Sequence, residues 1–148
     1  MARRSAVNLR TTHLVRDTCL CLHVQRAARA LARRFDEALR PVGLTNGQFS
    51  LLMALNRPDA PRMTAVADLL AMDRTTLTAA LKPLHRRGFV KIAPAPSDRR
   101  GRLLSLTPAG RKALARALPI WRNTHAALDS LLGDAESDRL RKNLRALA

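Results

Sequence analysis

The chain has 148 residues, of which 47% are hydrophobic, so it is long enough to bury one core and too apolar to be a disordered tail. Its 27 Lys and Arg residues against 11 Asp and Glu give a net charge of +16, which favours a polyanionic partner such as nucleic acid. The sequence contains no membrane-length apolar run, and its basic first ten residues lack the apolar segment of a secretory signal, so we expect a cytoplasmic protein.

The first part of the chain is predicted to be helical. Residues 1–15 are expected to begin as a loose segment and then to become helical. Apolar residues at helical spacing predict one helix over about residues 16–39. Pro41 ends this helix, because the residue before a proline avoids the helical region, and Gly43 completes the turn.

Two shorter helices are predicted next, separated by a breaker-rich loop. Thr45 can N-cap a helix over about residues 46–55, and Thr64 can N-cap a helix over about residues 65–71. The inward-facing side chains of these helices are expected to be Phe49, Leu52, Met53, Val66, Leu69 and Leu70.

A tight turn then leads into a basic helix and a hairpin. Asp73 is a good N-cap for a helix over about residues 74–87, and Gly88 suits the position after its end. The hydrophobic period then changes, which predicts strands at about 89–92 and 102–106 joined by a polar turn. We place that turn at residues 94–101.

Two further helices are predicted at the end of the sequence. Thr107 and Pro108 have the residue types of an N-cap and a first helical position. The helix that they start is expected to run to about residue 132, with a kink near Pro119. A last helix over about residues 135–147 follows the break at Gly133.

This order of elements predicts a mainly α fold with a small β-hairpin wing, that is, a winged helix-turn-helix in a single domain, 1–148. A helix fits the DNA major groove, and the first residues of a recognition helix contact base edges. Lys82, Arg86 and Arg87 lie toward its far end, where phosphate contacts are expected. The candidate base-reading side chains of the helix at 74–87 are Arg74, Thr75, Thr76 and Thr78.

Positive charge is densest where the basic helix passes into the hairpin. Residues 82–102 contain seven basic side chains and one acidic side chain. Any single Arg in this stretch is more often a solvated surface residue than a DNA ligand. The ordered set favours a DNA-binding wing at about 89–107, because an Arg at a hairpin tip can enter a narrow A·T minor groove. Its candidate residues are Asp98, Arg99, Arg100 and Arg102.

Several runs resemble the MarR family of dimeric winged-helix regulators. They are the residues 44–49, 72–78, 82–90 and 98–110, and the likeness extends from about Thr18 to the C-terminus. The family's Asp-x-Arg wing signature falls on Asp98 and Arg100. The resemblance implies that Arg100 enters the minor groove and that Asp98 braces an arginine by ion pairing. Ala79 and Ala80 depart from the family's pattern, since many relatives carry polar side chains there.

The resemblance also implies which parts of the chain form a dimer and which part binds DNA. Residues 1–40 and 109–148 correspond to helices that form a homodimer, and residues 41–108 correspond to the DNA-binding lobe. A symmetric dimer would bind a pseudo-palindromic operator in double-stranded DNA. Candidate interface or core residues are Leu114, Leu118, Trp121, Leu128, Leu131, Leu140, Leu144 and Leu147. The expected activity is repression that a small-molecule or oxidant effector releases.

Two effector hypotheses remain open. A small aromatic or anionic ligand would lie in a cleft lined by residues such as Arg16, Arg29 and Trp121. Alternatively, Cys21 would act as a thiol-based peroxide sensor, because its spacing from Gln48 matches the reactive cysteine of the family's hydroperoxide sensors. The supporting Tyr hydroxyls are absent, and Phe35 and Asn46 stand at the corresponding positions.

Other chemistry finds less support in the sequence. Cys19 and His23 are four residues apart, but two ligands are too few for a metal site, so no metal and no cofactor are expected. We find no phosphate-binding glycine loop and no nucleophile–base constellation, so we do not expect an enzyme. A low-specificity polyanion-binding protein would explain the charge without explaining the ordered helices and hairpin.

Overall fold

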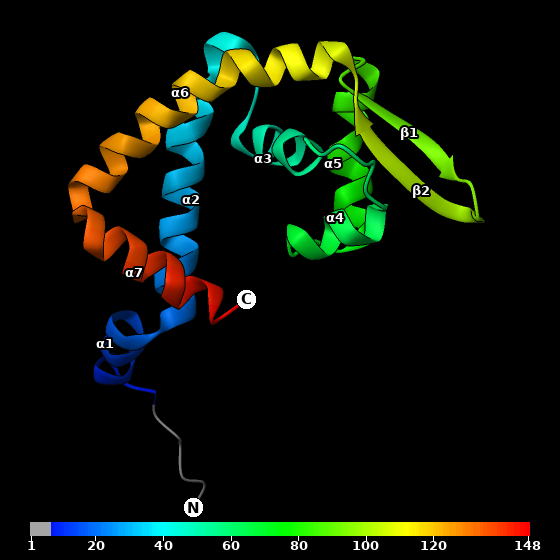
Figure 1. The fold of residues 1–148 in the computed structure, drawn as a ribbon. Coiled ribbons are helices and arrows are strands. Elements are labelled where there is room, and N and C mark those ends of the chain that lie inside the picture. The colour runs from blue at the N-terminus through cyan, green and yellow to red at the C-terminus, as the bar shows by residue number, and fades with distance from the viewer. Residues whose placement is uncertain (1–6) are drawn as a thin grey trace, which may run out of the picture. The chain divides into compact units, whose positions relative to one another are not determined.

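A computed structural model describes residues 7–148 and divides the chain into two compact units that meet between Arg34 and Phe35 (Figure 1). The elements in chain order are α1 (Leu9–Thr18), α2 (Leu20–Leu39), the 3-10 helix η1 (Arg40–Val42), α3 (Asn46–Ala54), α4 (Met63–Leu69), α5 (Arg74–Arg86), β1 (Val90–Ala95), β2 (Asp98–Leu106), α6 (Pro108–Leu132) and α7 (Asp134–Arg145). The predicted fold class, mainly helical with one hairpin, is confirmed.

The first unit contains α1 and most of α2. The prediction of one helix over residues 16–39 is wrong, because the backbone leaves helical conformation at Cys19 (φ −72°, ψ 105°). The Cys19 thiol then accepts the Leu22 N–H at 3.5 Å, in the manner of an N-cap for α2. None of residues 7–34 is buried within the chain. The predicted loose start of residues 1–15 lies partly outside the described residues, and helical structure begins at Leu9.

The apolar core lies in the second unit. Its fully buried side chains come from the end of α2, from α3 to α5 and from both strands: Leu39, Leu51, Leu52, Leu55, Val66, Leu77, Leu81, Leu84, Val90 and Leu104. Each such burial stabilises the fold by roughly 1.5–3 kcal/mol relative to exposure. Two predicted core positions are wrong, since Met53 and Leu69 are 40% and 58% exposed. Leu51 is buried instead, and α4 ends at Leu69, so its last side chain turns outward.

Three of the four predicted helix caps are confirmed. Thr45 forms a capping box with Gln48, and the Asp73 and Thr107 side chains accept backbone N–H groups at the starts of α5 and α6. Thr64 is not a cap, because α4 already begins at Met63. The N-cap position of α4 is occupied by Arg62, whose side chain makes no capping hydrogen bond.

The hairpin is longer than predicted. β1 and β2 pair antiparallel and are joined by Pro96 and Ser97 alone, so the expected turn over 94–101 is wrong. Proline is tolerated at Pro94 because β1 pairs with β2 alone, which leaves the other side of β1 unpaired in this sheet. The register changes abruptly, from Pro94 opposite Arg102 to Ala95 opposite Asp98. Residues 99–101 therefore bulge from the ladder.

The C-terminal helices carry the predicted breaks. Pro108 starts α6 and Pro119 lies inside it, and the ribbon of α6 changes direction along its length (Figure 1). Gly133, at φ 83°, separates α6 from α7. The Arg141 guanidinium on α7 binds the Asp129 carboxylate on α6, which ties the two helices together.

Gly110 provides a test of how α6 docks on the hairpin. A Cβ atom at this position would lie 2.1 Å from the Phe89 carbonyl oxygen. We therefore expect Gly110→Ala to lower the free energy of unfolding by about 1–3 kcal/mol, since backbone would have to move. The measurement is urea denaturation followed by circular dichroism.

Gly47→Ala is the matched control. No neighbouring atom lies within 4 Å of a Cβ there, and Gly47 lies within α3. Alanine should therefore raise stability by roughly 0.5–1 kcal/mol through helix propensity. Equal stability changes in the two variants would contradict the close approach of α6 to Phe89.

Candidate nucleic-acid interface

The face of α5 opposite the core presents the predicted base-reading residues. Burial of Leu77, Leu81 and Leu84 leaves the other side of the helix in solvent. An open groove of about 340 Å³ runs along that side and is lined by Arg74, Thr75, Thr78, Ala79 and Lys82. The two alanines noted in the sequence differ in exposure, since Ala80 packs against the core and Ala79 lines the groove.

Thr76 and Thr78 have local hydrogen bonds that limit what they can donate. The Thr76 hydroxyl donates to the Asp73 carboxylate at 2.8 Å, and the Thr78 hydroxyl donates to the Arg74 carbonyl oxygen at 2.7 Å. Both hydroxyl oxygens keep lone pairs that can accept from a base edge or a water. Of the four predicted base-reading residues, Arg74 and Thr75 are the two whose side-chain donors have no partner within residues 7–148.

Asp73 fixes the first turn of α5 electrostatically. The backbone N–H and the hydroxyl of Thr76 hold the pKa of Asp73 below its ordinary value. The carboxylate therefore stays charged at the positive end of the helix dipole. The pKa of Asp73 is lower in the folded state than in the unfolded state, where it lies near 4. The charged side chain therefore stabilises the fold above the unfolded-state pKa, and this stabilisation is lost as the pH falls through the folded-state pKa.

The far end of α5 is anchored to the protein rather than free. Arg87 donates to the Gly43 carbonyl oxygen at 2.7 Å and lies 4.5 Å over the Phe89 ring, so the phosphate contact expected for it competes with structural bonds. A His85 ring nitrogen lies 3.0 Å from the Val90 carbonyl oxygen. Lys82 and Arg86 are exposed and remain available for phosphate contact.

The bulge in β2 carries the wing residues. The Asp98 carboxylate accepts the Arg100 backbone N–H at 2.9 Å, and its second oxygen lies 3.6 Å from Nη1 of Arg62. The arginine that Asp98 braces is therefore Arg62, a residue that the sequence analysis did not identify. Arg102 folds back onto the Arg99 carbonyl oxygen at 2.8 Å. The side chains of Arg99 and Arg100 are exposed at the tip.

One cavity brings the helix and the wing together. It measures about 150 Å³ and is lined by Arg62, Met63, Thr64, Arg74, Asp98, Arg100, Gly101 and Arg102. Four guanidinium groups and one carboxylate thus meet where the start of α5 faces the bulge of β2. The four guanidinium groups make this site strongly positive.

A second group of side chains surrounds the only tryptophan of the chain. The Trp121 ring stacks 6.0 Å from Phe49 and lies 4.8 Å from His125. An apolar cavity of about 410 Å³ lies on its α3 side, and Phe49, Met53, Leu70 and Leu118 contribute to its wall. A second, more open cavity of about 490 Å³ also has a largely apolar wall but includes charged side chains, and we call it the polar cavity. It is lined by Trp121, Arg122, His125, Ala126, Asp129 and Arg141.

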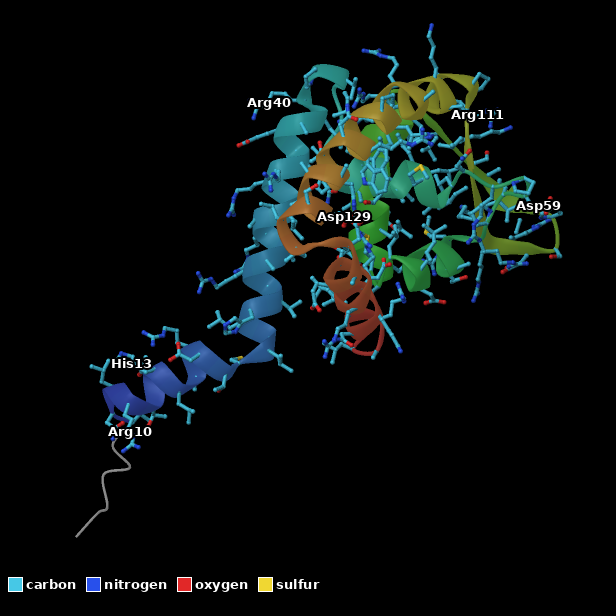
Figure 2. The ribbon with its side chains drawn as sticks, turned by 60° about the vertical axis from the view of Figure 1, so that its left-hand side comes forward. Arg10, His13, Arg40, Asp59, Arg111 and Asp129 are labelled. Atoms are coloured by element: carbon cyan, nitrogen blue, oxygen red, sulfur yellow. The ribbon has the colours of Figure 1, made fainter. Side chains whose placement is uncertain are left out.

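The polar cavity contains a charged network. Burial alone would raise the pKa of Asp129, but the Ser137 hydroxyl, His125 and Arg141 around it hold that pKa below its ordinary value. Asp129, labelled on α6 in Figure 2, binds Arg141 of α7. Arg141 already pairs with the Asp129 carboxylate, so Arg122 is the arginine of this cavity that has no ion-pair partner within residues 7–148.

The cysteines lie in the first unit. Cys19 is half-buried at the break before α2, and Cys21 is exposed and accepts a hydrogen bond from Gln25 at 3.1 Å. The His23 ring contacts the Cys19 carbonyl oxygen at 2.8 Å rather than the thiol. Arg10 and His13 project from α1 (Figure 2). Within residues 7–148, no group of three His, Cys, Asp or Glu side chains is placed to hold a metal ion.

The residues predicted for an interface or the core separate into three groups. Leu114 is buried in the core of its own chain. Leu118, Trp121 and Leu128 are half-buried. The remaining residues are exposed: Leu131, Leu140, Leu144 and Leu147.

The comparisons with known proteins agree with this geometry. Residues 42–101 match the sequence model of the MarR family. The crystal structure of the Mycobacterium tuberculosis transcriptional regulator MosR in complex with DNA is 37% identical, with a TM-score of 0.80 over 87% of this chain and 92% of that chain. The transcriptional repressor CouR bound to a 23-mer DNA duplex is 33% identical, with a TM-score of 0.80 over 90% and 94%.

Curated relatives match over a shorter region. The transcriptional activatory protein BadR of Rhodopseudomonas palustris is 34% identical over 62% of this chain and 54% of BadR. The multiple antibiotic resistance protein MarR of Escherichia coli is 32% identical over 53% of this chain and 54% of its own length. The chain therefore spans about half the length of these two relatives.

The helix-turn-helix with its basic hairpin defines a winged-helix transcriptional regulator. The chain belongs to the MarR family. In the described residues, no helix combines the length and the apolar character that a membrane span requires.

Proposed function

We propose that this protein is a dimeric, sequence-specific DNA-binding repressor. The observation that carries the proposal is the cavity in which Arg74 of α5 faces Arg100 and Arg102 of the wing. A major-groove reader and a minor-groove reader are thereby held side by side, as a winged helix requires. The DNA complexes of MosR and CouR support the same use of this fold.

The residues divide into three roles. The side chains that face base edges in the major groove are those of Arg74, Thr75, Thr76 and Thr78. Arg74 and Thr75 act as donors. Thr76 and Thr78, whose hydroxyl groups already donate within the protein, act as acceptors. Lys82 and Arg86 contact phosphates, which adds affinity without sequence information. Arg99 and Arg100 project from the wing into the minor groove, while Asp98 and Arg102 hold the bulge in shape.

Dimerisation accounts for the apolar surface left outside the core. Exposed leucines and valines occur on α1 and α2, and exposed leucines occur on the C-terminal helices, among them Leu9, Leu14, Leu31, Leu140 and Leu144. Residues 1–40 and 109–148 would bury them against a second copy, leaving 41–108 as the DNA-binding lobe. Two recognition helices about one DNA turn apart would then bind a pseudo-palindromic operator and exclude polymerase. A cytoplasmic, non-enzymatic protein follows from this role.

A low-specificity polyanion-binding protein is the competing function. Its binding would depend on charge alone and would collapse steeply with salt. Specific binding instead survives excess competitor DNA at moderate salt. The distinction is therefore a direct measurement on the purified chain.

An effector site is proposed around Trp121. The apolar cavity beside Phe49 can take an aromatic ring, and Arg122 in the adjoining polar cavity can bind a carboxylate. BpsR of Bordetella bronchiseptica, a structural relative at 25% identity, is regulated in its DNA binding by 6-hydroxynicotinic acid. An aromatic carboxylate bound here would favour a dimer whose recognition helices no longer match the operator.

Arg100→Ala tests whether the wing contributes more to DNA binding than one positive charge does. Loss of one minor-groove guanidinium should weaken binding to a selected duplex by roughly tenfold and flatten the preference for A·T-rich flanks. The measurement is fluorescence anisotropy at fixed salt. Arg116→Ala is the control, because it removes the same charge from an exposed position on α6, and it should change affinity little. Equal affinity and flank preference for Arg100→Ala and the wild type would rule out the wing assignment.

Trp121 fluorescence reports directly on the proposed effector site, since the chain has one tryptophan. Titration with benzoate, 4-hydroxybenzoate and 6-hydroxynicotinate should give saturable quenching with at least one of them and release the bound DNA. Arg122→Ala should weaken that binding, whereas nicotinamide, which is uncharged, should not quench. No saturable response to any of the three acids would refute the site.

A further inference from the structure

The N-cap position of α4 is used in an unusual way. Arg62 stands where a Ser, Thr or Asp side chain would accept an N–H of the first turn, and its side chain makes no capping bond. The guanidinium reaches the wing instead. Nη1 lies 3.6 Å from the Asp98 carboxylate, and Nη2 lies 3.5 Å from the Ser97 hydroxyl. Arg62 therefore contacts the tip of the hairpin from the helix-turn-helix body.

The backbone around Arg62 is held to the same hairpin. Arg62 forms an isolated antiparallel bridge with Leu103, and the Leu104 N–H donates to the Pro61 carbonyl oxygen at 3.0 Å. Leu104 is fully buried in the core. The position of the Arg62 side chain is thus fixed from two sides, by its own backbone pairing and by Asp98.

Gly101 leaves the space that this contact needs. A Cβ atom there would lie 2.9 Å from the Asp98 carboxylate and 3.1 Å from Nη1 of Arg62. Arg100 and Arg102, on either side of Gly101, line the same cavity of about 150 Å³ as Arg62 and Arg74. Asp98 can balance one of these four positive charges. The surplus favours a bound anion, which would remove the mutual repulsion of the guanidinium groups.

We propose that this cavity is a preformed seat for one backbone phosphate of bound DNA, with Arg62 and Arg74 as its ligands. Arg74 also lines the groove along α5, and its five N–H donors allow it to bind this phosphate and still donate to a base edge. Guanidinium groups match phosphate oxygens in a bidentate geometry, and the Thr64 hydroxyl on the cavity wall can donate to a third oxygen. The seat rests on the proposed DNA-binding function and extends it. One phosphate would bridge α5 and the wing, so Arg62 is a positioning residue for Arg100.

The test uses the full chain and a duplex that the wild type selects from a random-sequence pool. Methylphosphonate is placed at one phosphate at a time, which removes one charge per position. In the wild type, one position near the junction of the two grooves should weaken binding by roughly tenfold. In Arg62→Ala that penalty should become clearly smaller, because Arg74 and Thr64 remain, while the penalties elsewhere persist. The slope of log K against log salt should fall in magnitude by about 1.

Two further variants separate the phosphate contact from positioning of the wing. Arg62→Lys keeps the charge without the planar fork, so it should restore the salt slope but only part of the affinity. Asp98→Asn keeps every arginine and breaks the ion pair, so the salt slope should stay while hydroxyl-radical protection of the flanking minor groove weakens. Arg116→Ala, the charge-matched control, should retain the wild-type methylphosphonate pattern.

Three results would contradict the proposed phosphate seat. If Arg62→Ala keeps the wild-type salt slope and every methylphosphonate penalty, Arg62 binds no phosphate. If inorganic phosphate stabilises the wild type but not Arg62→Ala, with no methylphosphonate coupling, the occupant is a free anion. If the wild type selects no duplex from the pool, the proposed DNA-binding function itself fails, which is a distinguishable outcome.

Discussion

Burial of one face of α5 is the constraint on which the candidate interface depends. Leu77, Leu81 and Leu84 are almost completely enclosed, so rotation of the helix would expose them at a cost of roughly 1.5–3 kcal/mol each. That cost fixes which polar residues remain outside. Asp73 then fixes where the helix begins, because its charged side chain accepts from the Thr76 backbone and hydroxyl. Sequence specificity can therefore reside in a few side chains of the first turns.

In the wing, packing and backbone hydrogen bonds hold positively charged side chains close together against their mutual repulsion. The buried Leu104 and the backbone pairing with Pro61 anchor the hairpin to the body of the lobe. Four arginines then converge on one small cavity beside a single carboxylate. The protein tolerates this repulsion at an exposed site, and a polyanion would relieve it. We therefore expect the same arginines to lower the stability of the free protein and to raise its affinity for DNA.

The sequence was sufficient for features that depend on nearby residues. The caps at Thr45, Asp73 and Thr107 were predicted correctly, because each requires only a short polar side chain a few positions before a helical period. Contacts between distant residues were not predictable in this way. The Arg62–Asp98 pair joins two elements, and nothing in the pattern around Arg62 distinguishes it from a solvated arginine. The break at Cys19 was missed because the apolar period continues through it, and α4 is too short to define a face, so Leu69 was misplaced.

The wing was identified in sequence by its charge and its Asp-x-Arg signature, but its geometry required the bulge that Gly101 allows. In the proposed DNA complex, this wing and α5 contact one DNA site together in a symmetric dimer. Hydroxyl-radical footprinting on a duplex selected by the wild-type chain measures this arrangement. We expect two symmetric halves about one helical turn apart, each with protection of the outer minor groove beside the half-site. A single unsymmetric patch, or uniform protection without a boundary, would contradict it.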